Sequence, residues 1–239
     1  MRKIDDLIDK TKKYKKITVQ KNLKSKKNTV AYITINDKSR VLKWFVPGLK
    51  RNMKNEYKVL EKAKLKLDVP IVYEKDEKNN VLLMNYIAGE NLSDIINSYD
   101  TSYEEKKRLM ILLSKWFYKF HNFFKIEGKF LIHGDSNLRN FIFTDRIYGT
   151  DFEETRNGEP SEDIAVMCAS ILSSDPMFTK EKIKLCSILI DEYIKLAPGR
   201  ITNINNAISY AILQKIQWRP KQEKNLREYS QKIRKKGIR

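Results

Sequence analysis

The chain has 239 residues, 41% of them hydrophobic, which is enough apolar material for one large domain or two small lobes. Lys and Arg outnumber Asp and Glu by 48 to 30, and the formal charge of +18 favours anionic partners such as nucleotides, phosphorylated metabolites or RNA. Two cysteines exclude a disulfide framework, no apolar run reaches the roughly 18 residues of a membrane span, and MRKIDDLIDK does not resemble a signal peptide, so we expect a cytoplasmic protein.

Residues 1–87 predict a small antiparallel sheet with one helix. The alternating segments VAYITI (30–35) and RVLKWFV (40–46) flank NDKS, a pattern typical of a β-hairpin. Between Met53 and Leu67 the apolar residues recur at helical spacing, and Pro70 then interrupts the chain. The following segment, IVYEKDEKNNVLLMNYI, predicts a second hairpin.

Residues 88–239 change to long helical patterns, which places a lobe boundary between positions 87 and 88. The segments NLSDIINSY and EEKKRLMILLSKWFYKFHNFF predict helices, as do DIAVMCASIL and KIKLCSILIDEYIKL further on. Between the two pairs lies a β-rich island, FLIHGDSNLRNFIFTDRIYGTDFEE (130–154). Because loops held by a rigid scaffold often carry function, we expect the chemistry in this island.

The island contains three oxygen donors with a suggestive spacing. Asp135 and Asn140 lie five residues apart in HGDSNLRN, and Asp151 follows in GTDFEE. Magnesium binds a few carboxylate or amide oxygens and completes its shell with water and substrate phosphates. Phosphoryl transfer needs mainly positioning and charge neutralisation, which one carboxylate at the acceptor hydroxyl and a metal on the phosphates can supply.

These residues resemble the catalytic and metal-binding loops of the protein-kinase-like superfamily. The resemblance implies an α+β, two-lobed fold, with a small antiparallel sheet and one helix in the N-lobe and a mainly helical C-lobe. It implies an ATP-dependent phosphotransferase in which Asp135 orients the acceptor hydroxyl. Asn140 and Asp151 would hold Mg²⁺, with Asp151 opening the triplet that reads D-F-G in protein kinases.

The same resemblance assigns residues in the N-lobe. Lys43, within the apolar run VLKWFV, is similar to the lysine that contacts the α and β phosphates. Its helix partner is expected to be Glu56, about 45° from the centre of the apolar face, rather than Glu61 at about 95°. The segment VLLMNYIAGENL resembles the hinge that binds adenine through the backbone, which points to Asn85 and Ile87.

Three departures separate the chain from conventional protein kinases. The stretch KNLKSKKNTV contains no glycine, so a loop that covers the phosphates would rely on Lys24, Lys26 and Lys27 or be displaced. Glu153 replaces the glycine of the triplet, and Asp163 arrives only twelve residues after Asp151 without an A-P-E motif. A conventional regulated protein kinase is therefore disfavoured.

Two groups of atypical relatives remain open. In aminoglycoside and choline kinases the HGD loop, a D-x-E triplet and a D-I-A helix start recur, which favours a small-molecule acceptor hydroxyl. The small kinase of the KEOPS tRNA-modification complex and the RIO kinases share the size and the basic tail, which favours a protein substrate or ATPase activity near RNA. The sequence leans to the first group. A non-catalytic basic scaffold is disfavoured, because Lys43, Asp135, Asn140 and Asp151 are all retained.

The C-terminal segment QKIRKKGIR is strongly basic. It has too little apolar material to fold alone, so we expect residues Lys232 to Arg239 to be solvated and dispensable for ATP binding. With a polyanionic acceptor such as RNA, this tail would contribute a salt-dependent part of acceptor binding.

Overall fold

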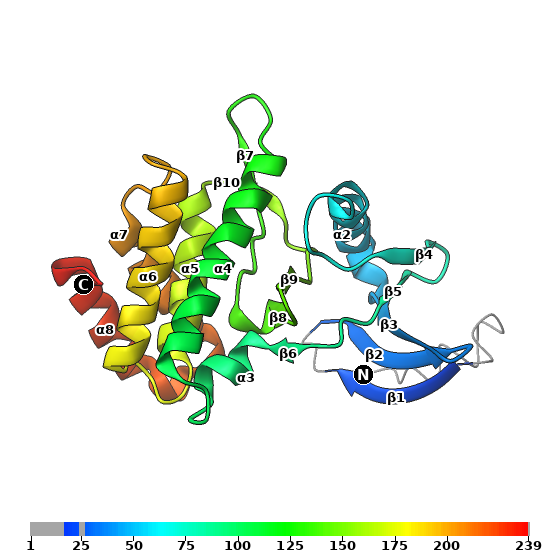
Figure 1. The fold of residues 1–239 in the computed structure, drawn as a ribbon, viewed down its shortest axis with the longest axis horizontal. Coiled ribbons are helices and arrows are strands. Elements are labelled where there is room, and N and C mark those ends of the chain that lie inside the picture. The colour runs from blue at the N-terminus through cyan, green and yellow to red at the C-terminus, as the bar shows by residue number, and fades with distance from the viewer. Residues whose placement is uncertain (1–16, 24–26, 239) are drawn as a thin grey trace. The chain divides into compact units, whose positions relative to one another are not determined.

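The computed structural model describes residues 17–23 and 27–238, which form two compact units (Figure 1). The first unit runs to Ala88 and also takes in Asp151–Glu154. The second comprises Gly89–Thr150 and Thr155–Arg239. Among the described residues, no helix combines the length and the apolar character needed to cross a bilayer.

An antiparallel five-stranded sheet dominates the first unit, in the order β1-β2-β3-β5-β4. Both predicted hairpins form, and a further strand, β1, precedes them. The turn between β2 and β3 places Asn36 and Asp37 at φ +48° and +59°, a left-handed conformation that Asn and Asp tolerate and that suits tight hairpins. The strands are β1 (Ile17–Leu23), β2 (Thr29–Ile35), β3 (Lys38–Trp44), β4 (Val72–Asp76) and β5 (Val81–Asn85).

The two faces of this sheet differ in what they carry. Ala31, Ile33 and Leu42 pack in a hydrophobic cluster with Val81 and Leu83 on one face. Side chains alternate along a strand, so Lys43, next to Leu42, points to the opposite face. The sheet therefore separates the position of Lys43 from this cluster.

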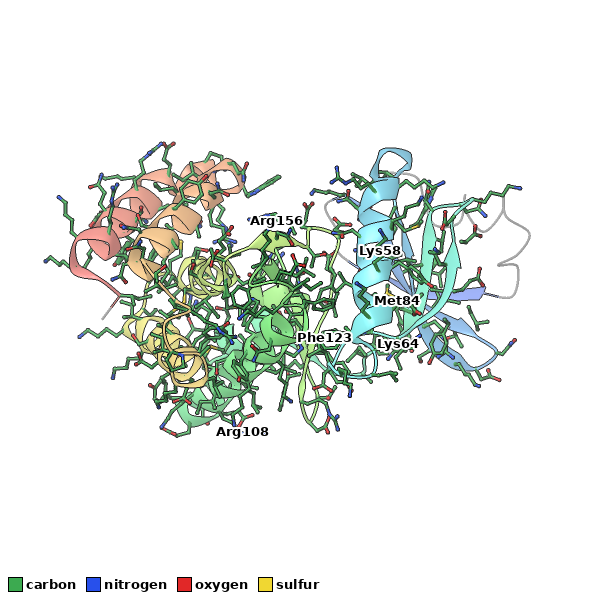
Figure 2. The ribbon with its side chains drawn as sticks, turned by 90° about the horizontal axis from the view of Figure 1, so that it is seen from above. Lys58, Lys64, Met84, Arg108, Phe123 and Arg156 are labelled. Atoms are coloured by element: carbon green, nitrogen blue, oxygen red, sulfur yellow. The ribbon has the colours of Figure 1, made fainter. Side chains whose placement is uncertain are left out.

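The helix α2 (Lys50–Ala63) of the first unit begins and ends earlier than the predicted range of 53–67. A short 3-10 helix, η1 (Pro47–Leu49), leads into it. At its end Leu67 donates its backbone N–H to Ala63 in a turn, which keeps Leu67 buried without extending the helix. The buried face of α2 includes Met53, Glu56 and Leu60, and Figure 2 labels Lys58 within the helix and Lys64 just past its end.

The second unit is mainly helical, and the predicted helices form with small shifts at their ends. The long helix α4 packs against α6, α5 packs against α7, and α7 packs against α8. Ser102 caps α4 through a hydrogen bond to the backbone N–H of Glu105, as expected for an N-cap serine. The helices are α3 (Leu92–Asn97), α4 (Tyr103–Phe123), α5 (Pro160–Ser173), α6 (Lys180–Leu196), α7 (Ile204–Gln214) and α8 (Glu223–Lys236).

The β-rich island contributes β7, β8 and β9 to two small sheets of the second unit, which β6 and β10 complete. One has the order β6-β8-β9, and the other pairs β7 with β10. Three short 3-10 helices, η2 (Leu138–Asn140), η3 (Lys215–Trp218) and η4 (Pro220–Gln222), complete the unit. The strands are β6 (Glu90–Asn91), β7 (Phe130–Ile132), β8 (Phe141–Phe143), β9 (Ile147–Gly149) and β10 (Arg156–Gly158).

The C-terminal segment is not a solvated tail, so that expectation was wrong. Helix α8 continues to Lys236, and Ile233 and Ile238 are 6% and 4% exposed. Gly237 turns the chain at φ +79°, and the backbone N–H of Ile238 donates to Asn205 Oδ1 at 3.3 Å. The Lys and Arg side chains of α8 are exposed, whereas Leu226, Ser230 and Ile233 are buried, so α8 is an amphipathic helix that packs on α7.

Deleting residues 232–239 should therefore destabilise the protein. Loss of the buried Ile233 and Ile238 side chains is expected to lower the free energy of unfolding by about 3 kcal/mol, measured by urea denaturation. The control is Lys235→Gln, which alters an exposed charge of the same helix. Equal stability of the truncated and full-length proteins would contradict the packed position of this segment.

Candidate active site

Lys43 is the centre of a buried ionic cluster in the first unit. It extends from β3 and is 5% exposed. Its Nζ lies 2.6 Å from Glu56 Oε2 on α2 and 2.5 Å from Asp151 Oδ1. A third carboxylate, Glu153 Oε2, lies 3.4 Å away. The partner on α2 is thus Glu56, whereas Glu61 pairs with Lys64 at the end of the helix.

Burial and charge act in opposite directions in this cluster. Burial alone would lower the pKa of Lys43, but the negative charges of Glu56, Asp151 and Glu153 outweigh it and raise that pKa. Burial raises the pKa of Glu56 to about 7, although Lys43 opposes the rise. Burial also raises the pKa of Glu153. The lysine stays charged, and one proton is readily taken up by the surrounding carboxylates.

The raised pKa of Glu56 predicts a pH dependence of stability. Between its ordinary pKa of 4.5 and about 7, the unfolded chain ionises Glu56 while the folded chain retains the proton. The stabilisation is complete below pH 4.5 and is lost as the pH rises through 7, by about 3 kcal/mol. Urea denaturation of wild type and Glu56→Gln over this range should show a steeper fall in the wild type, while Glu153 contributes to both profiles. Parallel profiles would argue against a raised pKa of Glu56.

Asp151 combines an unusual backbone conformation with metal-ligand chemistry. Its φ of +66° lies in the left-handed region, which a non-glycine residue adopts at a cost and which often marks functional positions. Its side chain is 38% exposed, and carboxylate oxygens of Glu56, Asp151 and Glu153 lie within 4.8 Å of one another. This all-oxygen donor set fits a hard divalent cation such as Mg²⁺, with Asp151 as its most accessible member.

In the second unit, Asp135 and Asn140 lie on one tightly hydrogen-bonded loop. Asn140 Nδ2 donates to the backbone oxygen of Asp135 at 2.7 Å and to its Oδ2 at 3.1 Å. Because the amide nitrogen faces Asp135, the side-chain oxygen of Asn140 is the atom suited to bind a metal. Asn137, which the sequence reasoning did not single out, donates from Nδ2 to Asp135 Oδ1 at 2.6 Å. These bonds hold the carboxylate of Asp135 in one orientation.

Asp163, at the start of α5, is hydrogen-bonded to the residues on either side of Asp135. Its carboxylate accepts the backbone N–H groups of His133 and Gly134 and the hydroxyl of Ser136, at 2.7, 3.1 and 2.9 Å. It also lies 3.0 Å from His121 Nε2, and His121 Nδ1 lies 2.7 Å from the Tyr193 hydroxyl. In the sequence, Asp163 is recognisable only as a helix-start signal, because its partners on other elements are not visible as a local pattern.

The network around Asp163 predicts a large loss of stability on substitution. Burial opposes ionisation, but the hydrogen bonds and charges of His121 and His133 outweigh it and lower the pKa of Asp163. Asp163→Asn removes the negative charge and places an amide N–H group against groups that are themselves hydrogen-bond donors. We therefore expect the free energy of unfolding, measured by urea denaturation, to fall by about 3–5 kcal/mol. Asp145→Asn, the same change in an exposed turn, is the control. Equal stability of the two variants would refute this role.

Of the predicted hinge residues, Asn85 ends β5 and Ile87 lies two residues beyond it. Asn85 donates its backbone N–H to Ile71 O at 3.0 Å and accepts the Ile71 N–H on its side-chain oxygen at 2.6 Å. Its predicted backbone contact with adenine therefore falls on its carbonyl oxygen. Ile87 is buried, and between the two Tyr86 stacks on Tyr32 with ring centroids 4.4 Å apart.

The lysines proposed to cover the phosphates are only partly described. Lys24 and Lys26 lie outside the described residues. Lys27 is exposed, and its Nζ lies 2.5 Å from Glu154 Oε1. Next to it, Asn28 is buried, and its Nδ2 donates to Glu153 Oε2 at 2.5 Å. The loop between β1 and β2 thus contacts the segment that carries Asp151.

Comparisons with known proteins find the same fold in solved kinase structures. No family model matches the chain. A solved ternary complex of APH(2")-IIa with streptomycin and ATP is 19% identical, with a TM-score of 0.62, and covers 93% of this chain and 91% of that one. An ethanolamine kinase from Plasmodium vivax is 13% identical, with a TM-score of 0.60, and covers 89% of this chain and 77% of that one.

A curated relative adds a local likeness in sequence. The KEOPS complex subunit Bud32 from Pyrococcus abyssi is 30% identical over 99 residues, which is 41% of this chain and 41% of that protein. The chain thus matches less than half of this relative's length. The structural likenesses cover nearly the whole chain at low identity, and they establish the fold that the sequence predicted.

Proposed function

Because the chain has a protein-kinase-like fold, we propose that it is an ATP-dependent phosphotransferase that moves the γ-phosphate of ATP to an acceptor hydroxyl. The observation that carries the proposal is that each unit holds one of the two groups of residues needed for phosphoryl transfer in a defined hydrogen-bonded arrangement. The first unit holds Lys43 between Glu56 and Asp151. The second holds the Asp135 carboxylate against Asn140 and Asn137. A fold kept only as a scaffold would not need either arrangement.

In this proposal each residue has a distinct role. Asp135 accepts a hydrogen bond from the acceptor hydroxyl, orients it and takes up its proton as transfer proceeds. Lys43, oriented by Glu56, contacts the α and β phosphates. Asp151 and the side-chain oxygen of Asn140 would hold Mg²⁺, and Glu153 is a further candidate ligand. The bound metal supplies neutralisation of charge on the phosphates.

The nucleotide base is proposed to bind at the end of β5. The carbonyl of Asn85 and the backbone N–H of Ile87 are two residues apart on the same strand exit, the spacing at which an extended backbone presents successive groups on one side. The side chain of Asn85, fixed on Ile71, holds this strand exit in place. Recognition through the backbone would leave the side chains free to differ from those of other kinases.

A small-molecule hydroxyl is the favoured acceptor. The segment from Asp151 to Asp163 is short and leads directly into α5 at Pro160, so it lacks the long stretch with which protein kinases bind peptide substrates. The streptomycin complex and the ethanolamine kinase named above support this preference. The local likeness to Bud32 and the charge of +18 favour the alternative, an atypical protein kinase or ATPase that works with an RNA-modifying complex.

A screen with ATP labelled at the γ-phosphate tests the proposal and separates its alternatives. The purified protein is incubated with Mg²⁺ and, in parallel, aminoglycosides, choline and ethanolamine, a generic protein acceptor, and tRNA with its modifying proteins. Label in a small molecule supports the favoured reading, and label in protein supports the alternative. Transfer that is equally fast with Lys43→Met would show that the cluster around Lys43 does not act in the reaction.

A further inference from the structure

Glu153 is held by three different elements of the first unit. Its carboxylate accepts from Asn28 Nδ2 at 2.5 Å and lies 3.4 Å from Lys43 Nζ. Its backbone oxygen accepts from Asn55 Nδ2 on α2 at 3.2 Å. Asn28 and Glu153 are 7% and 9% exposed, so their hydrogen bond is shielded from water. A charge-assisted bond in such a place fixes the carboxylate firmly.

The chemical nature of the Asn28 side chain matters for what Glu153 can bind. A lysine or arginine at this position would neutralise Glu153 and weaken its attraction for a cation. The amide of Asn28 orients the carboxylate without adding charge. Three carboxylates, those of Glu56, Asp151 and Glu153, surround the single ammonium group of Lys43, so this group of four side chains keeps an excess of negative charge. Such a cluster is prepared for a further cation.

The loop between β1 and β2 lacks the glycines that let a backbone wrap phosphates. Its described part reaches the Asp151–Glu154 segment through side chains instead. The pair formed by Lys27 and Glu154 is exposed, with side chains 51% and 41% accessible, so water and salt weaken it. The buried bond from Asn28 to Glu153 is the stronger connection between the two segments.

We propose that Asn28 is a positioning residue for magnesium, because it holds Glu153 beside Asp151 and joins the β1–β2 loop to the metal-binding segment. This inference rests on the proposed function, and it extends that function to a loop without glycines. Asn28 acts through Glu153 and contacts neither metal nor nucleotide. Residues that orient metal ligands in this way typically change metal affinity about 10- to 100-fold when they are replaced.

The test measures the Mg²⁺ concentration that half-saturates ATP binding, by titration calorimetry at a fixed ATP concentration. Asn28→Leu keeps the size of the side chain but removes the donor, and Asn28→Ala is the smaller second variant. Both should raise the Mg²⁺ midpoint at least about 10-fold, while binding at saturating Mg²⁺ stays close to wild type. Lys64→Ala, which breaks the exposed pair with Glu61 on the same unit, should leave the midpoint unchanged (Figure 2).

A double-substitution cycle separates positioning from a general loss of structure. In a Glu153→Ala background, Asn28→Leu should shift the midpoint less than about twofold, because the proposed route through the Glu153 carboxylate is already gone. Wild-type midpoints in both Asn28 variants, or an equal shift with and without Glu153, would overturn the inference while leaving the proposed function intact. A wild-type protein whose ATP binding ignores Mg²⁺ would overturn both.

Discussion

Asp135→Asn is expected to lower the rate of phosphoryl transfer by about 10²–10⁴-fold, the usual contribution of a positioned general base. Asparagine has the same size and can still accept from Asn137 or Asn140, so the loop should keep its shape. It cannot take up the proton of the acceptor hydroxyl. ATP affinity should change little, because the proposed role of Asp135 concerns the acceptor.

Turnover and ATP binding, measured on the same preparation, give the two readouts. Asp145→Asn makes the same chemical change in the exposed turn between β8 and β9 and should leave both unchanged. If ATP affinity fell as much as the rate in Asp135→Asn, the residue would act on the nucleotide and its assignment would be wrong.

Asp151→Asn is expected to weaken ATP binding at least about 30-fold in the presence of Mg²⁺ and hardly at all in its absence. The Asp151 carboxylate and the ATP phosphates are proposed to bind the same Mg²⁺ ion. Loss of the charged ligand therefore weakens ATP binding only when the metal is present. Asparagine is chosen because the backbone at φ +66° tolerates it better than alanine.

The measurement is an ATP titration with Mg²⁺ or with a chelator. The Asp151→Asn substitution also removes one of the three carboxylates around Lys43, so Lys43→Met is measured in parallel to show which loss follows from the lysine. An ATP affinity that is equal in wild type and Asp151→Asn under both conditions would exclude a metal bridge at this residue.

The parts of the structure that depend on local patterns were predictable. The alternation in VAYITI and RVLKWFV gave the hairpin of β2 and β3, and helical spacing singled out Glu56 over Glu61 as the partner of Lys43. The Asp135 and Asn140 pair lies on one short loop, where its spacing alone indicates a shared environment. Such features need no knowledge of distant contacts.

The parts that depend on contacts between distant segments were missed. Asn28 meets Glu153 across 125 positions, and Asp163 meets His121 across 42, so neither pair leaves a periodic signal. The C-terminal helix was misjudged for a related reason. Charge dominates its composition, whereas the two isoleucines that fix it, Ile233 and Ile238, are recognisable only once α7 supplies their partner.

Transfer of label from γ-labelled ATP, compared between wild type and Asp135→Asn in the presence of Mg²⁺ and the best acceptor from the screen, tests the central claim most directly. We predict a phosphate ester of the acceptor hydroxyl in the wild type, and a yield at least about 100-fold lower in the variant, with ATP binding preserved. Equal transfer by both proteins, or ATP bound by the wild type without transfer to any acceptor class, would contradict a phosphotransferase that uses Asp135.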